Sequence, residues 1–470
     1  MALAGVVVLA AVLRTVVAHQ ALYGDEIFTH DEVAHRSFGW MWHRVQVVED
    51  SPPLFTAVTW VAARVFGAAG LALRAVSIVA AAATVPLLYG IGRRLGGRAA
   101  GLLGATVFAV SPFAVFYGSE ARAYSLMAFL LVLSTYALVR AVESGTWRWW
   151  GAFAAANAAA LYTHYTAGAV IAAQACWLLA ARPRQWRVGV AAAASSAAVF
   201  APWLLFAPSP TLAGFQVLFP FGADWAAKAL AHLAIGHPFV PLRTLPGTLG
   251  FALLAVAAVA TAAGLALARR APRVSSGWAL IGLLALAAPA GAAAYSLIAT
   301  SVFASRNLYA SLPFAALAAG AVVAAGRMRA VAAVALVAAL LVTAVRIDQP
   351  SNRRPQFDEG AQALDRVPGR VVVLNLFPVR DQFGRHPLLD SLTIQMADPR
   401  RAVEVARGDV KSYDRAMRGA LVHVVEEPPG VAVGDPPPPP VPPGYRELRR
   451  RVFPGFSRIA LYDFVRSAPS

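Results

Sequence analysis

The chain has 470 residues, of which 58% are hydrophobic and only 14% are charged. In a typical soluble domain about a quarter of the residues are charged, and such a domain cannot bury so much apolar surface. The composition therefore excludes an ordinary soluble protein. The net charge of +17 would suggest a nucleic-acid partner in a soluble protein. Here the basic residues lie in short loops between apolar runs, as in cytoplasmic loops of membrane proteins, and we expect no nucleic-acid binding.

Apolar runs long enough to cross a bilayer recur along the chain. We expect a mainly α-helical polytopic membrane protein with about eleven transmembrane helices, each near the 20 residues that cross the hydrocarbon core. The first run is expected to be a spanning helix rather than a signal peptide, because it lacks a basic start and a cleavage site. The segment 53–66 is shorter and is a candidate for the membrane interface. The expected spans are residues 3–20, 70–91, 99–117, 123–141, 149–163, 165–181, 188–206, 245–268, 277–299, 308–325 and 329–346.

Basic clusters follow every second expected span. Short cytoplasmic loops are enriched in Lys and Arg, so this parity predicts a cytoplasmic N-terminus and an extracytoplasmic tail after residue 346, in a multi-pass protein of the plasma membrane. The intervening loops, including residues 21–69 and 207–244, are then outside. The clusters are Arg93, Arg94 and Arg98, then Arg148, and the segments 181–187, 268–273 and 326–329.

The tail differs in character from the spans. Short β-like runs at 371–376, 420–425 and 459–465, with a helical stretch near 358–366, predict a small extracytoplasmic α/β domain over residues 347–470. The transmembrane domain is then residues 1–346. The segment 434–444, GDPPPPPVPPG, is predicted to be an extended loop, for which a stiff spacer is favoured over a recognition motif.

The first outer loop concentrates acidic residues in a chain that is poor in them, in the stretch LYGDEIFTHDEVAHR at 22–36. Asp25 and Glu26 follow the first span directly, and we favour a functional role for this pair. Asp31 and Glu32 are expected to form the solvated face of a short surface helix. Arg14, inside the first span, is expected to snorkel or to pair with an acid rather than to bind substrate.

Further ionisable residues fall on the predicted outer side, although they are far apart in sequence. Charged groups inside a membrane are energetically costly and usually face a cavity or one another. These residues together therefore predict one polar, outward-facing site. Two simpler explanations stay open: Glu120 and Arg122 pair with each other or cap a helix, and His164 is a satisfied core histidine. The residues are Asp50, Glu120, Arg122, His164 and Arg306.

Acids and bases at one membrane surface favour a particular chemistry. A carboxylate takes a proton from an attacking hydroxyl, and cationic side chains hold a phosphate that leaves with its charge. This suits transfer from a lipid-linked phosphate donor. The sequence has no phosphate-binding loop of the Walker type and no dinucleotide fingerprint, so nothing indicates a soluble nucleotide donor. No cofactor is expected to be required; a divalent metal stays open but is not indicated.

Five motifs together resemble the GT-C glycosyltransferases. The chain has Asp25-Glu26 after its first span, Asp50 with Pro52-Pro53 before the next helix, and the blocks SPFAVFYGSEARAYSL, YTHY and SRNLYASLP. The most similar group is the family 39-like bacterial branch, related to protein O-mannosyltransferases and lipid A aminoarabinose transferases. The resemblance covers about residues 1–346 in order and spacing. One departure is Asn307 after Arg306, where the family commonly has tyrosine.

The resemblance implies a polyprenyl-phosphate sugar donor, an outward active site and an inverting transfer. Asp25 takes the position of the catalytic base, with Glu26 beside it. The implied substrate-binding residues are Asp50, Glu120, Arg122, Tyr124, His164 and Arg306: the two arginines near the donor phosphate, Glu120 orienting the arginine and His164 lining the cavity. The sugar, a hexose such as mannose or a pentose, and the acceptor, a lipid, glycan or protein, stay open.

Two other classes of protein were weighed against a transferase. A lipid or glycolipid transporter or flippase would also carry intramembrane charges, but it should show an inverted repeat with broken helices, and none is evident. A scaffold or receptor needs only one or two spans to anchor its outer domain, which argues against that class.

Overall fold

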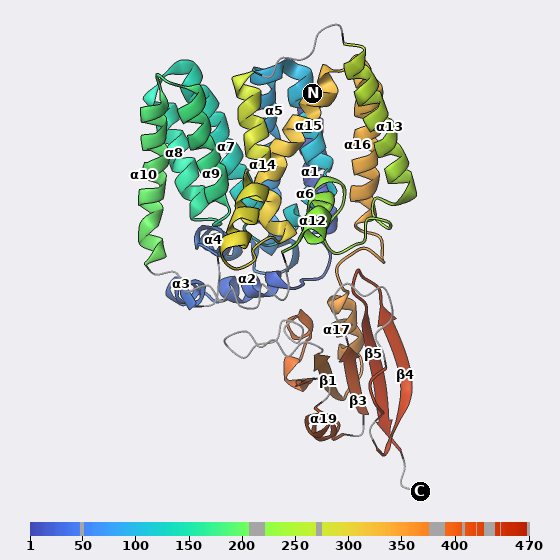
Figure 1. The fold of residues 1–470 in the computed structure, drawn as a ribbon. Helices are drawn as coiled ribbons and strands as arrows, with labels where there is room; N and C mark the ends of the chain where they lie inside the picture. Colours follow the sequence, from blue (N-terminus) through green and yellow to red (C-terminus); the bar gives the residue numbers. More distant parts are fainter. Residues whose placement is uncertain are drawn as a thin grey trace. The chain divides into compact units, whose positions relative to one another are not determined.

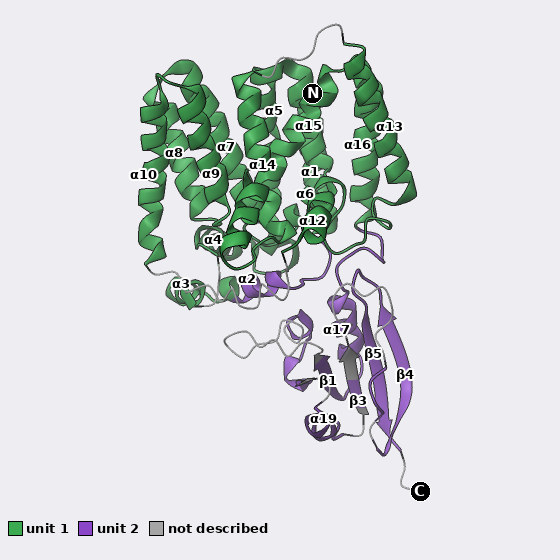
Figure 2. Cartoon of the chain, viewed as in Figure 1, with its two compact units in different colours: residues 1–18, 32–347 green, residues 19–31, 348–470 purple. Residues whose placement is uncertain are grey.

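The computed structural model describes residues 1–47, 51–205, 221–268, 275–375, 391–406, 409–419, 421–426, 438–441 and 443–467. These residues form two compact units, which Figure 2 distinguishes by colour. Unit 1 contains residues 1–18 and 32–347, and unit 2 contains residues 19–31 and 348–470. Unit 2 thus combines the C-terminal residues with a segment from near the N-terminus.

Unit 1 is a bundle of helices (Figure 1). Within it, α7, α8, α9 and α10 gather at one side, and α13 packs along α16 at the other. Helix α2 (Asp25–Ala34) begins in unit 2 and ends in unit 1. The elements of unit 1 are α1 (Ala2–Val17), α3 (Phe38–Val47), α4 (Leu54–Phe66), α5 (Gly70–Val110), α6 (Pro112–Gly118), α7 (Tyr124–Ser144), α8 (Trp147–Leu161), α9 (Ala167–Ala181), α10 (Trp186–Leu204), α12 (Ala223–Ile235), α13 (Gly247–Ala266), α14 (Ser276–Ile298), the 3-10 helix η1 (Ser305–Ser311), α15 (Leu312–Ala325) and α16 (Arg329–Arg346).

Each of the eleven expected spans corresponds to helical residues. Seven helical segments among the described residues are long and apolar enough to cross a membrane, and the chain is a multi-pass membrane protein. Two expected spans lie in the single element α5, whose halves meet at Gly97 with a φ of 85° that only glycine adopts without strain. The second of them ends at Val110 rather than at residue 117, because Ser111 caps a new helix, α6, that starts with Pro112.

Small residues bring the two central helices of unit 1 together. A Cβ atom built on Gly320 of α15 would clash with the backbone nitrogen of Gly104 in α5, so Gly320 does not tolerate a side chain without movement. Close approach at small residues is a common packing mode in membranes, where no hydrophobic force draws helices together.

Buried polar side chains join α7, α8 and α9. Nε2 of Gln174 donates to Ser134 Oγ and Thr135 Oγ1, both at 2.9 Å, and Asn157 Nδ2 donates to Gln174 Oε1 at 3.1 Å. Such interhelical hydrogen bonds in the membrane contribute about 0.6–2 kcal/mol each.

The C-terminal domain is a five-stranded sheet in the order β2-β1-β3-β5-β4. Strand β1 runs parallel to β2 and β3, and β5 runs antiparallel to β3 and β4. Side chains alternate between two faces: Tyr413 of α19 packs on the core of one face, and Phe357 of α17 packs on the core of the other. The elements are α17 (Phe357–Asp365), β1 (Arg370–Asn375), the 3-10 turn η2 (Pro399–Arg401), β2 (Ala402–Ala406), α19 (Val410–Ala416), β3 (Leu421–Glu426), β4 (Tyr445–Phe453) and β5 (Ile459–Arg466).

The expected runs at 371–376, 420–425 and 459–465 agree with β1, β3 and β5, and the helical stretch near 358–366 agrees with α17. Residues 434–437 and 442 of the predicted proline-rich loop lie outside the described residues.

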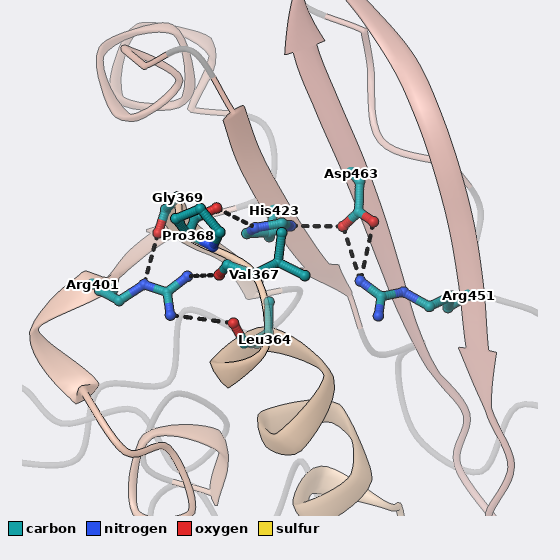
Figure 3. Close-up of polar contacts among 8 residues, drawn as sticks. All are labelled: Leu364, Val367, Pro368, Gly369, Arg401, His423, Arg451 and Asp463. Atoms are coloured by element: carbon teal, nitrogen blue, oxygen red, sulfur yellow. Dashed lines mark hydrogen bonds and ion pairs between the residues drawn. The ribbon is translucent and has the colours of Figure 1, made fainter.

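A buried polar cluster links three strands of this sheet (Figure 3). His423 on β3 faces Asp463 on β5, with Nδ1 and Oδ1 2.6 Å apart, and Arg451 on β4 donates to both carboxylate oxygens of Asp463 at 3.2 and 3.0 Å. Nearby, Arg401 donates to the carbonyl of Leu364 in the last turn of α17 and to those of Val367 and Gly369 just after it. These bonds satisfy polar groups that would be costly to bury alone.

Candidate active site

Arg122 lies in the short connection between α6 and α7. Its backbone N–H donates to the carbonyl of Glu120 at 2.8 Å, and its own carbonyl accepts a hydrogen bond from Ser77 Oγ of α5 at 3.2 Å. Glu120 is 9% exposed, whereas Arg122 is partly exposed. The backbone at Arg122 is therefore held by two neighbours, and its long side chain keeps access to solvent.

Arg306 is the second residue of η1, the 3-10 helix that follows α14 in the chain. Asn307 Nδ2 donates to the carbonyl of Val302 at 2.7 Å, which closes the chain before Arg306 into a compact turn. Ser311 Oγ, at the end of η1, donates to Leu284 O at 2.7 Å and accepts from Ala288 N at 2.9 Å. Because this hydroxyl lies between a donor and an acceptor four residues apart in α14, it fastens η1 to that helix. Asn307, which replaces the tyrosine common in the family, thus has a structural partner.

His164 lies in the turn between α8 and α9, outside both helices. Its Nδ1 accepts the backbone N–H of Thr166 at 3.3 Å and lies 2.9 Å from Thr166 Oγ1. A neutral ring that accepts at Nδ1 carries its proton on Nε2, which is then a donor. The carbonyl of Tyr162 accepts the N–H of Leu54, the residue after Pro52-Pro53, at 2.9 Å. Two of the motifs recognised in the sequence are therefore joined directly.

The electrostatics bring three of the predicted residues together. Burial, followed by the positive charges of Arg122 and Arg306, lowers the pKa of His164 from its ordinary 6.5 to about 3. Part of the surface of His164 remains accessible, and burial of the ring is nevertheless the largest cause. Both arginines act on the histidine because they are close to it. We call Arg122, His164 and Arg306 the basic cluster; it disfavours a further positive charge and favours an anion.

Aromatic residues line the basic cluster. The ring of Tyr124, two residues after Arg122, lies 5.5 Å from that of His164 and 6.4 Å from that of Tyr309. Tyr117 lies 5.1 Å from Tyr124. Tyr124 is 4% exposed and Tyr309 is fully buried, so both rings belong to the packed interior of unit 1.

The two predicted catalytic carboxylates lie in unit 2, in the first turn of α2. Asp25 is partly exposed, whereas Glu26 is fully buried. Glu26 Oε2 lies 3.8 Å from Nε of Arg354, a residue of the C-terminal domain. Asp50 lies outside the described residues. Among the residues that the structure does describe, no three His, Cys, Asp or Glu side chains gather as metal ligands.

Two expectations for other charged residues were wrong. Arg14 does not snorkel: it is fully buried and donates to the carbonyls of Ala10, Phe108 and Ala109. The last turn of α5 leaves carbonyls without helical partners, and a cation there is favourable. Glu32 is not part of a solvated face. It is fully buried and accepts a hydrogen bond from Thr56 Oγ1 at 3.4 Å, whereas Asp31 keeps partial exposure.

Sequence reasoning missed Tyr309 and Arg354. Tyr309 lies in the recognised block SRNLYASLP, but a tyrosine between apolar residues is no signal by itself. Arg354 had one: Arg353-Arg354 follows the last span on the side where the basic-residue pattern predicts few arginines. Such an exception to the charge pattern indicates a buried or paired role.

The chain was then compared with known proteins. The family described as dolichyl-phosphate-mannose-protein mannosyltransferase matches residues 50–206, which is less than half of the chain. Among solved structures, ArnT from Cupriavidus metallidurans bound to undecaprenyl phosphate superposes with a TM-score of 0.53 at 15% identity, covering 98% of this chain and 97% of that one. The chain has the GT-C fold.

An oligosaccharyltransferase from Archaeoglobus fulgidus, crystallised with zinc and sulfate, gives a TM-score of 0.46 at 12% identity, over 89% of this chain and 67% of that one. No curated protein matches the sequence. The GT-C fold expected from the motifs is confirmed.

Proposed function

We propose that this protein is a membrane glycosyltransferase that moves a sugar from a polyprenyl-phosphate carrier to an acceptor on the extracytoplasmic side. The observation that carries the proposal is the basic cluster, in which the charges of two arginines from distant parts of the chain act on one neutral histidine. The fold is compatible, because the ArnT structure that superposes on this chain holds undecaprenyl phosphate.

The basic cluster is suited to a phosphate that gains charge as its sugar leaves. Charge-assisted hydrogen bonds from arginine to phosphate are about twice as strong as neutral ones. Nε2–H of His164 adds a neutral donor without adding a charge that would repel the arginines. Glu120, buried beside Arg122, is proposed to orient that arginine.

The remaining chemistry needs a base. In the proposed step, the carboxylate of Asp25 takes the proton of the acceptor group, whose oxygen, or other nucleophilic atom, attacks the anomeric carbon. The bond from that carbon to the phosphate oxygen breaks, and the polyprenyl phosphate leaves with the electron pair. One displacement of this kind inverts the anomeric configuration. Asp25 is assigned from the motif it shares with the family and from its partial exposure, which an accepting carboxylate requires.

The extracytoplasmic side is inferred from the basic loops, which favour an N-terminus in the cytoplasm and residues after 346 outside. Labelling of single cysteines introduced at positions 95 and 400 of sealed membranes tests this orientation. Labelling of both positions from one side would contradict it.

The function itself is tested with purified protein, a labelled polyprenyl-phosphate sugar and candidate lipid, glycan and peptide acceptors. A transferase produces glycosylated acceptor and an equal amount of polyprenyl phosphate. A lipid transporter leaves the sugar-phosphate bond intact and moves the donor between leaflets of a vesicle. Movement of intact donor, with no cleavage under any acceptor, would overturn the proposal.

A further inference from the structure

The segment that follows α1, including the first part of α2, folds with the C-terminal domain. Residues 19–31 belong to the same compact unit as residues 348–470 (Figure 2). Gln20 makes two of the contacts: its Nε2 donates to Asp348 Oδ1 at 3.0 Å, and its Oε1 accepts the backbone N–H of Arg354 at 3.0 Å. The ring of Tyr23 stacks 6.2 Å from Phe357 and meets the edge of Phe456 at 5.5 Å.

The centre of this contact is a buried ion pair. Glu26 and Arg354 have side-chain exposures of 0% and 1%, and Oε2 of Glu26 lies 3.8 Å from Nε of Arg354. The same carboxylate oxygen accepts the N–H of Tyr23 at 3.4 Å. A charge buried at this depth is stable only with its partner in place, so the pair specifies where the first turn of α2 lies against the domain.

Arg354 itself is held on a rigid part of the backbone. The carbonyl of Arg353 accepts the N–H of Phe456 at 2.8 Å. At Gly455, an added Cβ would lie 2.9 Å from the Cα of Pro355 and 3.2 Å from the carbonyl oxygen of Arg354, so the two chain segments are in contact. The guanidinium is therefore presented by a fixed scaffold and not by a free loop.

Asp25 and Glu26 are adjacent in the first turn of α2 but differ in environment. Gly24, with a φ of 60°, turns the chain into the helix, and its carbonyl accepts the N–H of Ile27 at 3.1 Å. Glu26 is fully buried, while Asp25 keeps part of its surface accessible. Of these two adjacent carboxylates, Glu26 is paired with Arg354, and the partly exposed Asp25 is the better suited to receive a proton from a substrate.

We propose that Arg354 is a positioning residue for sugar transfer, which pairs with Glu26 to fix the first turn of α2 and so aim the carboxylate of Asp25. The inference rests on the proposed function, in which Asp25 is the base. It assigns Glu26 to positioning rather than to proton transfer.

The test uses the full-length purified protein and four variants: Arg354→Met, Arg354→Lys, Glu26→Gln and the double variant Glu26→Gln/Arg354→Met. Arg353→Met is the matched control, because Arg353 is the adjacent arginine and pairs with the half-exposed Glu359 at 3.5 Å. For each variant, kcat and KM for the donor, the Kd for undecaprenyl phosphate and the Tm are measured. Glu26→Gln and Arg354→Lys keep the side-chain size, and they carry the test if Arg354→Met fails to fold.

We expect kcat to fall by about 10- to 100-fold in Arg354→Met and Glu26→Gln, since a displacement of about 1 Å in a reacting group costs up to 10²-fold. The Kd for undecaprenyl phosphate should stay within about twofold of wild type, because the basic cluster is untouched. Arg354→Lys should recover part of the loss, and the double variant should lose no more than the worse single variant, as expected for residues that act as a pair.

Three results would overturn the inference. The first is wild-type kcat in both Glu26→Gln and Arg354→Met. The second is a parallel loss of kcat, donor binding and Tm, which indicates general damage. The third is a loss in Glu26→Gln as large as in Asp25→Asn, which would make Glu26 a proton acceptor. Failure of the proposed function is a separate result, in which the wild-type protein moves intact donor and cleaves none of it. Failure of the base assignment alone is separate again, because Asp25→Asn would then retain transfer whatever the Arg354 variants do.

Discussion

Ser125 Oγ and Tyr309 Oη lie 3.4 Å apart, and each is the third residue after an arginine of the basic cluster. The bond joins α7 to η1 across 184 positions of sequence. Because each arginine lies only three residues before one of the bonded residues, the hydrogen bond fixes the spacing of the two segments that carry Arg122 and Arg306.

Tyr309→Phe removes this bond while keeping the ring in its buried place. A hydrogen bond between neutral groups contributes about 0.5–1.5 kcal/mol, so donor binding should weaken by roughly 2- to 10-fold. Ser125→Ala should have a similar effect, and the double variant should lose no more than either single one. The Kd for undecaprenyl phosphate measures this. Full additivity of the two losses would show that the hydroxyls act separately.

Arg122→Ala and Arg306→Ala should each weaken donor binding by about 10- to 150-fold. The estimate follows from about 1.5–3 kcal/mol for a hydrogen bond to a charged group, with 1.4 kcal/mol per factor of ten. Lysine should rescue only in part, because it lacks the planar, two-pronged set of donors. Arg140→Ala is a suitable control, since Arg140 forms a half-exposed pair with Glu143. Wild-type affinity in both cluster variants would remove the proposed phosphate site.

Asp25→Asn keeps the shape of the side chain but removes the proton acceptor. Transfer should fall by at least about 10²-fold, the lower end of the contribution of a general base. Donor binding and Tm should change little, because Asp25 is partly exposed and Asn is isosteric. Near-normal turnover by the purified variant would show that Asp25 is not the base.

The lowered pKa of His164 predicts an acid dependence of stability. The unfolded chain protonates this histidine near its ordinary pKa of 6.5, whereas the folded protein resists protonation down to about 3. Between these values the unfolded state binds the extra proton, so stability falls as the pH decreases from 6.5 toward 3. His164→Asn should weaken the decrease in Tm between pH 7.5 and pH 5, when both proteins are measured in the same detergent. An identical decrease in both would contradict the prediction.

The lowered pKa of Asp463 predicts that the C-terminal domain also loses stability in acid. Burial raises the pKa of this carboxyl, but its bonds to His423 and Arg451 outweigh burial, and the pKa lies below its ordinary 3.8. The corresponding stability is complete above the ordinary pKa and is lost as the pH falls below 3.8 through the folded value. Asp463→Asn should remove that part of the acid dependence, as judged by protease resistance of the tail. Asp409, an exposed residue whose pKa is also lowered by bonds to Ser412, gives the control Asp409→Asn.

The sequence predicted well those features that depend on local composition. Each apolar run became helix, and the charged loop residues Arg122, His164 and Arg306 were identified individually. Their convergence needed the structure, because loops far apart in the chain meet only through helix packing. Strand β4 was missed for a physical reason: it is an edge strand with four arginines in nine residues, so it lacks the apolar alternation by which a half-buried strand is recognised.

The pairing of Glu26 with Arg354 lay beyond the sequence for a different reason. Neither residue belongs to a sequence pattern from which its partner could be predicted, and more than 300 positions separate the two residues. The same limit applies to Arg14, whose partners are backbone carbonyls that any residue type could provide. Side-chain partnerships of this kind depend on tertiary geometry alone.

Because residues 19–31 fold with residues 348–470, the C-terminal domain is assembled from two pieces that lie near opposite ends of the chain. Residues 19–31 leave the ribosome long before residues 348–470, and they can pack against them only after residues 32–347 have also been translated. A cut after residue 347 does not release an intact domain, and a tail expressed alone lacks the side chains of Gln20, Tyr23 and Glu26. Glu26 can therefore meet Arg354 only after most of the chain has been translated.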